Sequence, residues 1–172
     1  RKKTDYFGGI IVQEFDAELG KLVGEEKIVF KGTKLGCTEG PQILKKDGWY
    51  YLITAEGGTS YDHAVTVCRA QNVWGPYELH PENPILTSRH QEDAELQRAG
   101  HGFFVETQNG EWYLSHLCGR PISDPENPIE TSKYAQGRCT LGRETALQNI
   151  EWRDNWPYVV GGTSPSLQIQ AP

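Results

Sequence analysis

Two short turns constrain the fold more strongly than any other feature of this sequence. Asp47-Gly48 precedes the aromatic run 49–52, and Asn109-Gly110 precedes a similar run further along the chain. Asp-Gly and Asn-Gly between apolar runs favour β-hairpins, because the tight primed turns need residues with positive φ. The sequence therefore predicts two antiparallel hairpins, which span residues 38–52 and 101–117.

The two hairpins repeat with a fixed spacing. Gly48 and Gly110 stand 62 residues apart, and the same spacing separates Glu39 from His101. Repeats of roughly 40 to 50 residues are typical of β-propeller blades, and a longer repeat suits a four-stranded blade with long loops. The innermost strands of a propeller converge on its axis, so we expect Glu39 and His101 to share one pocket. The alternative is two unrelated hairpins in a β-sandwich.

The length of the chain bears on how much of a propeller it contains. Its 172 residues hold fewer than three such repeats, whereas closed propellers generally have four to eight blades. The chain also begins at Arg1 without an initiator methionine. We therefore expect an all-β fold, a partial β-propeller of about three blades, that forms part of a larger propeller.

Several segments between the hairpins carry weaker signals. Residues 143–152 fit a helix or a strand, and we favour a strand because Trp152 and the run 157–160 continue a β pattern. The charged segment 88–98 is expected to be a solvated loop. Residues 119–137, with their prolines and polar side chains, are expected to form a long surface excursion, and the tail after Gly162 a linker.

Composition excludes several classes of function. A formal net charge of −6 argues against nucleic acid or an anionic membrane as the main partner, because both favour basic surfaces. The sequence holds no run of 18 apolar residues. The four cysteines form no Cys-x-x-Cys pair, so the sequence indicates no zinc site. It also contains no phosphate-binding glycine loop or nucleophile elbow.

Glu39 is the strongest candidate for chemistry, since it stands at the start of an apolar strand beside Gly40. The competing interpretation is an exposed charge. His101 is either its partner or a core histidine whose ring is satisfied by hydrogen bonds. Arg143 is a pocket residue, a solvent-exposed charge or the ion-pair partner of its neighbour Glu144. Glu56 and the pair Asp62-His63 are weaker candidates.

Several motifs resemble glycoside hydrolase family 43, most closely its β-xylosidase and α-L-arabinofuranosidase branch. The resemblance covers nearly the whole chain in the right order. It is carried by the following segments: Thr38-Glu39-Gly40-Pro41, residues 50–59, Trp74-Gly75-Pro76-Tyr77-Glu78, Asn83-Pro84-Ile85-Leu86-Thr87, Ala99-Gly100-His101-Gly102, residues 109–114, residues 116–121 and Leu141-Gly142-Arg143-Glu144-Thr145.

The resemblance implies a role for each candidate residue. Family 43 enzymes are five-bladed propellers that hydrolyse glycosides with inversion, using an Asp base on the first blade, an Asp that tunes the acid on the second and a Glu acid on the third. Glu39 matches the general acid, and His101 and Arg143 match residues that line the sugar pocket. Both aspartates would precede residue 1. The resemblance thus implies that residues 1–172 are the C-terminal portion of the catalytic propeller, approximately blades 3–5.

The resemblance also implies a substrate and partners. The expected parent enzyme removes xylose from the non-reducing ends of β-1,4-linked xylo-oligosaccharides; the alternatives are an α-L-arabinofuranosidase acting on arabinoxylan-derived chains, or a fragment that serves only as a carbohydrate-binding or structural piece. The expected partners within the parent are the missing blades and a C-terminal β-sandwich. No redox cofactor is expected. Calcium occurs at the propeller axis in parts of the family, but no acidic cluster in this sequence supports a site near His101.

Overall fold

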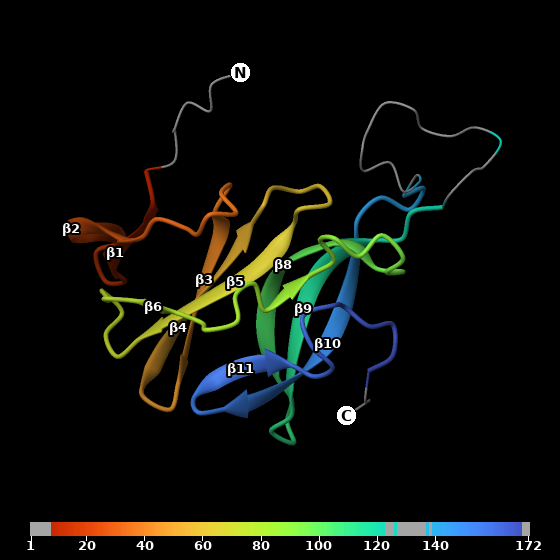
Figure 1. The fold of residues 1–172 in the computed structure, drawn as a ribbon. Helices are drawn as coiled ribbons and strands as arrows, with labels where there is room; N and C mark the ends of the chain where they lie inside the picture. Colours follow the sequence, from red (N-terminus) through yellow and green to blue (C-terminus); the bar gives the residue numbers. More distant parts are fainter. Residues whose placement is uncertain (1–7, 123–125, 127–136, 138, 170–172) are drawn as a thin grey trace.

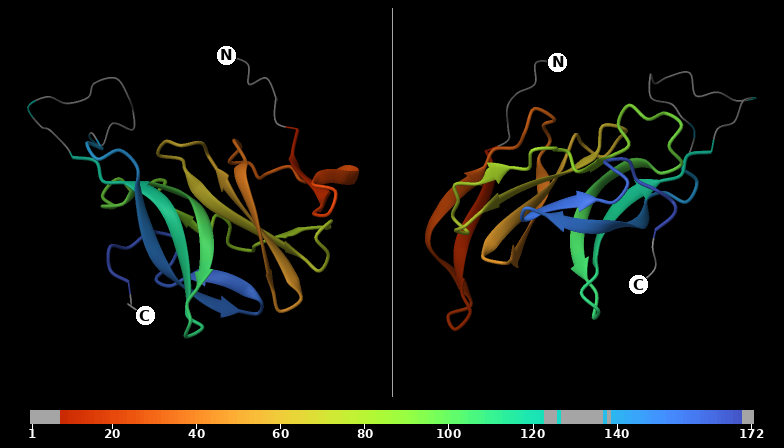
Figure 2. Two further views of the ribbon diagram at one scale, coloured as in Figure 1. Left: turned by 180° about the vertical axis from the view of Figure 1, so that it is seen from behind. Right: turned by 60° about the horizontal axis from the view of Figure 1, so that its bottom comes forward.

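The computed structural model describes residues 8–122, 126, 137 and 139–169, and every regular element in that part of the chain is a β-strand. Three antiparallel sheets follow one another along the chain and in space (Figure 1). The same succession is visible from behind and from below (Figure 2). The molecule is a partial β-propeller, as the repeat predicts. Within the described residues, no helix is long and apolar enough to cross a membrane.

The first sheet contains only two strands, β1 (Ile10–Asp16) and β2 (Lys21–Phe30). Asp16 shapes the turn between them, because its Oδ1 accepts hydrogen bonds from the backbone N–H groups of Glu18 (2.9 Å) and Leu19 (2.8 Å). The hairpin buries little of its apolar surface, and Phe15 remains 60% exposed. Within the described residues this sheet is therefore an incomplete blade of two strands.

The second sheet is a complete blade with strand order β3-β4-β5-β6, in which β7 also pairs with β5. Asp47 (φ 48°) and Gly48 (φ 81°) form the predicted two-residue turn. Strand β5 is almost wholly buried, because neighbouring sheets cover both of its faces. The bounds of the strands are β3 (Glu39–Lys46), β4 (Trp49–Glu56), β5 (Ala64–Ala70), β6 (Glu78–Leu79) and β7 (Leu86–Thr87).

The third sheet is also a four-stranded blade, with strand order β11-β10-β9-β8. The strand chosen for residues 143–152 is confirmed, since β10 pairs on one side with β9 and on the other with β11. A helix there would leave β11 unpaired and one edge of β9 without a partner strand. The bounds are β8 (Gln97–Glu106), β9 (Trp112–Gly119), β10 (Glu144–Arg153) and β11 (Trp156–Val159).

The constant spacing between the two hairpins does not hold strand by strand. Lys46 pairs with Trp49 across the turn 47–48, whereas Glu106 pairs with Trp112 across the longer connection 107–111. The pairing of β8 with β9 also shifts register twice near the start of β8, whereas the pairing of β3 with β4 shifts once. The starts of β3 and β8 nevertheless lie at similar levels of their hairpins.

Two surface segments make more contacts with the rest of the structure than their sequences predict. Segment 88–98 is not simply solvated, because Gln97 is 1% exposed and its amide donates hydrogen bonds to the carbonyls of Gln91 (2.7 Å) and Ala94 (2.6 Å). The tail is not a free linker, because Gln148 donates to the carbonyl of Ser166 (3.0 Å) and accepts from its N–H (2.9 Å). Buried amides need such partners, and nearby backbone supplies them. The predicted excursion 119–137 lies mostly outside the described residues.

The main hydrophobic core lies between the two complete blades. Strands β4 and β5 of one blade pack against β8 of the next, and the buried side chains come from both sheets. Such a core holds successive blades together, because each sheet alone would leave one apolar face exposed to water. Its buried members are Tyr51, Ile53, Val65, Val67, Ile85, Leu86, Ala99, Phe104, Leu114, Ile150, Trp156 and Val159.

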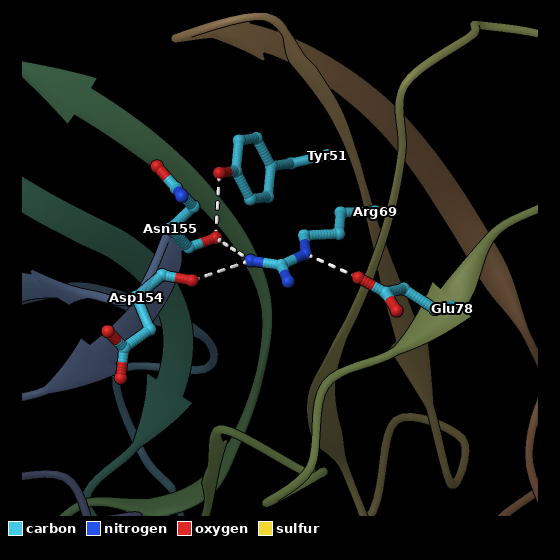
Figure 3. A network of polar contacts seen from close by, with 5 residues as sticks. All are labelled: Tyr51, Arg69, Glu78, Asp154 and Asn155. Carbon is cyan, nitrogen blue, oxygen red and sulfur yellow. Dashed lines mark hydrogen bonds and ion pairs between the residues drawn. The ribbon is translucent and has the colours of Figure 1, made fainter.

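Arg69 joins the two blades at the rim of this core (Figure 3). Its guanidinium lies 4.2 Å from the ring centroid of Trp49 and 3.8 Å from that of Trp156, so aromatic faces from both blades contact the cation. Its Nη1 donates to the carbonyls of Asp154 (2.8 Å) and Asn155 (2.5 Å) in the β10–β11 turn.

The remaining contacts of this cluster complete the link. Arg69 Nε donates to Glu78 (2.6 Å), and the hydroxyl of Tyr51 donates to the carbonyl of Asn155 (2.8 Å) (Figure 3). Asn155 has φ of 57°, which directs the turn toward the neighbouring blade. One cation therefore connects β5, β6 and the β10–β11 turn.

We predict that Arg69→Leu in the intact protein lowers the free energy of unfolding by about 2–4 kcal/mol, because it removes charge-assisted hydrogen bonds and two cation–π contacts. Urea unfolding measures the loss. The matched control is Arg153→Leu, which removes an exposed ion pair with Glu151 and a cation–π contact with Tyr158 within one blade and should cost only about 1 kcal/mol. Equal losses in the two variants would contradict a role for Arg69 in joining the blades.

Candidate functional site

Glu39 is the first residue of β3 and pairs with Ala55 of β4. The ladder shifts register immediately afterwards, where Gly40 has φ of 56°. The Glu39 side chain is exposed and makes no hydrogen bond or ion pair with another residue that the structure describes. Its carboxylate is therefore available to a ligand at this end of the blade.

His101 lies against the residue that follows Glu39. A Cβ added to Gly40 would stand 2.7 Å from Nε2 and 2.9 Å from Cε1 of the His101 ring, so only glycine permits this approach. His101 itself has φ of 52°, which is unusual for a non-glycine residue inside a strand. The structure thus places the His101 ring of one blade beside Gly40, the chain neighbour of Glu39, in the other.

The alternative for His101, a core histidine satisfied by hydrogen bonds, does not describe it. The side chain is only partly buried, and its ring makes no hydrogen bond with any residue in the described part of the chain. A half-exposed ring without a hydrogen-bond partner among the described residues suits ligand binding better than packing.

Arg143, immediately before β10, is held by three backbone carbonyls from different segments. Its Nε donates to Cys118 (3.3 Å), Nη1 to Thr59 (3.1 Å) and Nη2 to Arg98 (3.1 Å). Burial, followed by the charge of Arg98, lowers the pKa of Arg143 from its usual value. The guanidinium is therefore a fixed cation, placed between the two blades.

The interpretation that Arg143 pairs with its neighbour Glu144 is wrong. Glu144 instead accepts hydrogen bonds from Arg120, whose Nη2 stands 2.7 Å from Oε1. Arg143 is instead held by the carbonyls of Cys118, Thr59 and Arg98, so its guanidinium is engaged away from its chain neighbour.

His63 is a site residue to which the sequence gives little weight. It is 1% exposed, and its Nδ1 lies 3.0 Å from Arg143 Nη2 and 3.1 Å from the carbonyl of Arg98. Burial lowers the pKa of His63 to about 4; the nearby Arg98 carbonyl opposes this shift, and the charges of Arg143, His101 and His116 add to it. His63 is thus an uncharged ring between the two expected pocket residues.

Glu56 holds the segment that leads to Glu39. The Glu56 carboxylate is fully buried and accepts hydrogen bonds from the Thr33 N–H (2.8 Å), the Thr38 hydroxyl (2.8 Å) and the Thr33 hydroxyl. A Cβ on Gly32 would collide with the Thr38 hydroxyl at 2.0 Å. The only sequence signal for this role is a charge at the end of an otherwise apolar strand.

Other nearby carboxylates are engaged elsewhere. Asp62 pairs with Arg89 at 2.9 Å, and Glu56 is occupied by its three donors. Within the described residues, no group of three or more His, Cys, Asp or Glu side chains is arranged to hold a metal ion. The arrangement offers one free carboxylate, one half-exposed imidazole and one fixed guanidinium, a set that suits proton transfer to, and hydrogen bonding of, a neutral polar ligand.

Comparison with protein families agrees with this geometry. The model of the family described as "Glycosyl hydrolases family 43" matches residues 1–157. The chain belongs to this family. Its fold is accordingly a partial five-bladed propeller, and the sandwich alternative is excluded.

Individual relatives of this family 43 chain are xylosidases by name. It is 66% identical over 172 residues to "Xylan 1,3-beta-xylosidase" of Vibrio sp, covering 100% of this chain and 32% of that protein. It is 51% identical to "Xylosidase/arabinosidase 43B" of Humicola insolens, over 100% of this chain and 30% of that protein. The crystal structure of xylan beta-1,4-xylosidase from Bacillus halodurans C-125 matches with a TM-score of 0.88 and 49% identity, over 100% and 31%. The chain thus spans about a third of these proteins.

The buried histidines predict how stability depends on pH. Burial lowers the pKa of His80 to about 4, as it does for His63, against an ordinary value of 6.5. The hydrogen bond of His80 to Pro157 opposes this shift, while Arg69 and Arg153 add to it. Between pH 4 and pH 6.5 these histidines are protonated in the unfolded chain and neutral in the folded chain. Stability is therefore full above pH 6.5 and falls toward pH 4, by about 1.4 kcal/mol per pH unit for each histidine.

We predict that the midpoint of thermal unfolding of the intact protein falls between pH 7 and pH 4.5, and that His80→Asn makes the fall less steep. Asn keeps an acceptor for the Glu82 N–H, which bonds His80 Nδ1 at 3.0 Å. The exposed His90 serves as the matched control, and His90→Asn should leave the slope unchanged. Parallel pH profiles for wild type and His80→Asn would contradict the prediction.

Proposed function

We propose that the protein containing this chain is an inverting glycoside hydrolase that releases xylose from the non-reducing ends of β-1,4-linked xylo-oligosaccharides, with Glu39 as the general acid. The observation that carries the proposal is the close approach of the His101 ring to Gly40, the residue that follows Glu39, at the end of the blade where the Glu39 carboxylate is exposed and unpaired among the described residues. Membership of family 43 and the names of the relatives support the same function.

The chemistry assigns a task to each residue. Glu39 protonates the glycosidic oxygen as the bond to the leaving sugar breaks, while a base activates a water on the opposite face of the ring. His101 and Arg143 donate hydrogen bonds to sugar hydroxyls and hold the ring in place. Because Arg143 is fixed by three carbonyls, it is preorganised for this task and loses little entropy on binding.

The base comes from outside the described residues. In inverting enzymes the two carboxyl groups stand roughly 6.5–9.5 Å apart, and the described carboxylates near Glu39 are either buried or paired. We assign the base and an acid-tuning aspartate to chain that precedes residue 1. Residues 1–172 are then approximately blades 3–5 of the catalytic propeller, followed in the intact protein by a β-sandwich, and are inactive on their own.

Two alternative functions have specific support. The relative with 66% identity is named a 1,3-β-xylosidase, which favours a β-1,3 linkage. A relative with 51% identity is named a xylosidase/arabinosidase, which favours arabinofuranosides as a second substrate. Hydrolysis of 1,4- and 1,3-linked xylobiose and of an aryl arabinofuranoside by the intact protein separates these activities. A protein that cleaves none of them is a carbohydrate-binding or structural propeller.

We predict that Glu39→Gln in the intact protein lowers kcat/KM for xylobiose by about 10²–10⁴-fold, because the leaving sugar needs a proton. Aryl xylosides with acidic phenols leave with little protonation and should lose much less. Initial rates on both substrates for wild type and variant measure the difference.

The matched control for this experiment is Glu106→Gln, an exposed glutamate at the opposite end of β8. It should change the rate on either substrate by less than about twofold, as exposed substitutions usually do. Equal losses on the two substrates in Glu39→Gln would refute the acid role, even if the variant were badly impaired.

A further inference from the structure

We propose that His63 is a positioning residue for Arg143: it accepts a hydrogen bond from the guanidinium and thereby aims that group at the sugar. This inference rests on the proposed function of Arg143 in substrate binding. It is carried by the contact between His63 Nδ1 and Arg143 Nη2 at 3.0 Å, in a site where every other partner of the guanidinium is a backbone carbonyl.

The direction of this hydrogen bond follows from the donors and acceptors present. A guanidinium only donates, so Nδ1 of His63 accepts with its lone pair and carries no proton. The carbonyl of Arg98 then accepts from Arg143 Nη2 at 3.1 Å, rather than from His63. The imidazole is thus neutral, with its proton on Nε2, in agreement with the direction of its pKa shift.

The surrounding fold holds the ring in this orientation. A Cβ on Gly100 would stand 2.4–2.6 Å from three ring atoms of His63, so the ring lies directly on the backbone of β8. The carbonyl of His63 also accepts a hydrogen bond from the Thr87 hydroxyl at 2.8 Å. Both contacts leave the imidazole little freedom, which a positioning residue requires.

The orientation leaves one polar atom unsatisfied. His63 Nε2 is buried and has no hydrogen-bond partner among the described residues. A buried donor without a partner is destabilising, and such atoms call for an explanation in native structures. Rotating the His63 ring would move Nδ1 away from Arg143 Nη2. The unsatisfied Nε2–H is therefore the cost of keeping Nδ1 as the acceptor for the guanidinium.

His63 acts on the sugar only through the Arg143 side chain. Arg143 Nη2 is shared between His63 and the Arg98 carbonyl, while Nη1 and Nε are held by Thr59 and Cys118. Loss of the His63 acceptor releases the Nη2 edge alone. We therefore expect a weaker grip on the substrate without loss of the blade fold.

The experiment compares His63→Leu, which has no acceptor, with His63→Asn, whose amide oxygen takes the place of Nδ1. In the intact protein, His63→Leu should lower kcat/KM for xylobiose by roughly 10- to 100-fold, and His63→Asn by less than about threefold. In an Arg143→Ala background, His63→Leu should add less than about threefold, because it acts through the absent guanidinium. Equal losses in Leu and Asn variants, or full additivity with Arg143→Ala, would overturn the inference.

A second readout does not depend on activity. Crystal structures of the two variants should show the Arg143 guanidinium displaced from the Arg98 carbonyl in His63→Leu and retained there in His63→Asn. An unmoved guanidinium in His63→Leu would overturn the positioning role. Failure of wild type to cleave any xyloside or arabinofuranoside would instead refute the proposed function, while these structures would still decide the role of His63.

Discussion

The contact between the two complete blades is the constraint on which the rest of this structure depends. Each blade is a twisted sheet with an apolar face, and β4 and β5 can bury that face only against β8 of the next blade. Arg69 closes the rim of this interface, between Trp49 and Trp156. The candidate site lies where the same two blades meet near the starts of β3 and β8, so the geometry of Glu39, His101 and Arg143 is a property of the interface rather than of either sheet.

Much of the fold follows from local sequence patterns. Asp47-Gly48 and Asn109-Gly110 place both hairpins and with them strands β3, β4, β8 and β9. The association of Glu39 with His101 could also be predicted, because repeated units in a propeller bring equivalent strand starts to one axis. That expectation needs only the approximate length of the repeat, and the structure places the His101 ring beside Gly40, the neighbour of Glu39, although the spacing does not hold strand by strand.

The rest of the site could not be predicted, for reasons that lie in the backbone. Arg98 and His101 have positive φ without being glycine, and no local pattern announces such residues. Their conformations turn one carbonyl toward Arg143 and one ring toward Gly40. His63 and Glu56 are polar residues in sequence contexts that equally suit the surface; only the tertiary structure shows that both are buried. Arg143 and Glu144 are adjacent and oppositely charged, which suggests an ion pair from the sequence. In the structure they do not pair, because Glu144 binds Arg120 and Arg143 binds backbone carbonyls.

The bulged start of β8 has a consequence for how this fold accommodates change. The two hairpins differ in the length of their far connections, yet the His101 ring still lies against Gly40, and irregular residues near the starts of both strands shift the register between turn and site. The length of the turn at one end of the hairpin and the register at the other end can therefore differ independently of each other. Insertions at the outer turns leave the positions of the site residues unchanged. A single bulge near the start of a strand changes the direction of a site side chain while the rest of the sheet stays the same.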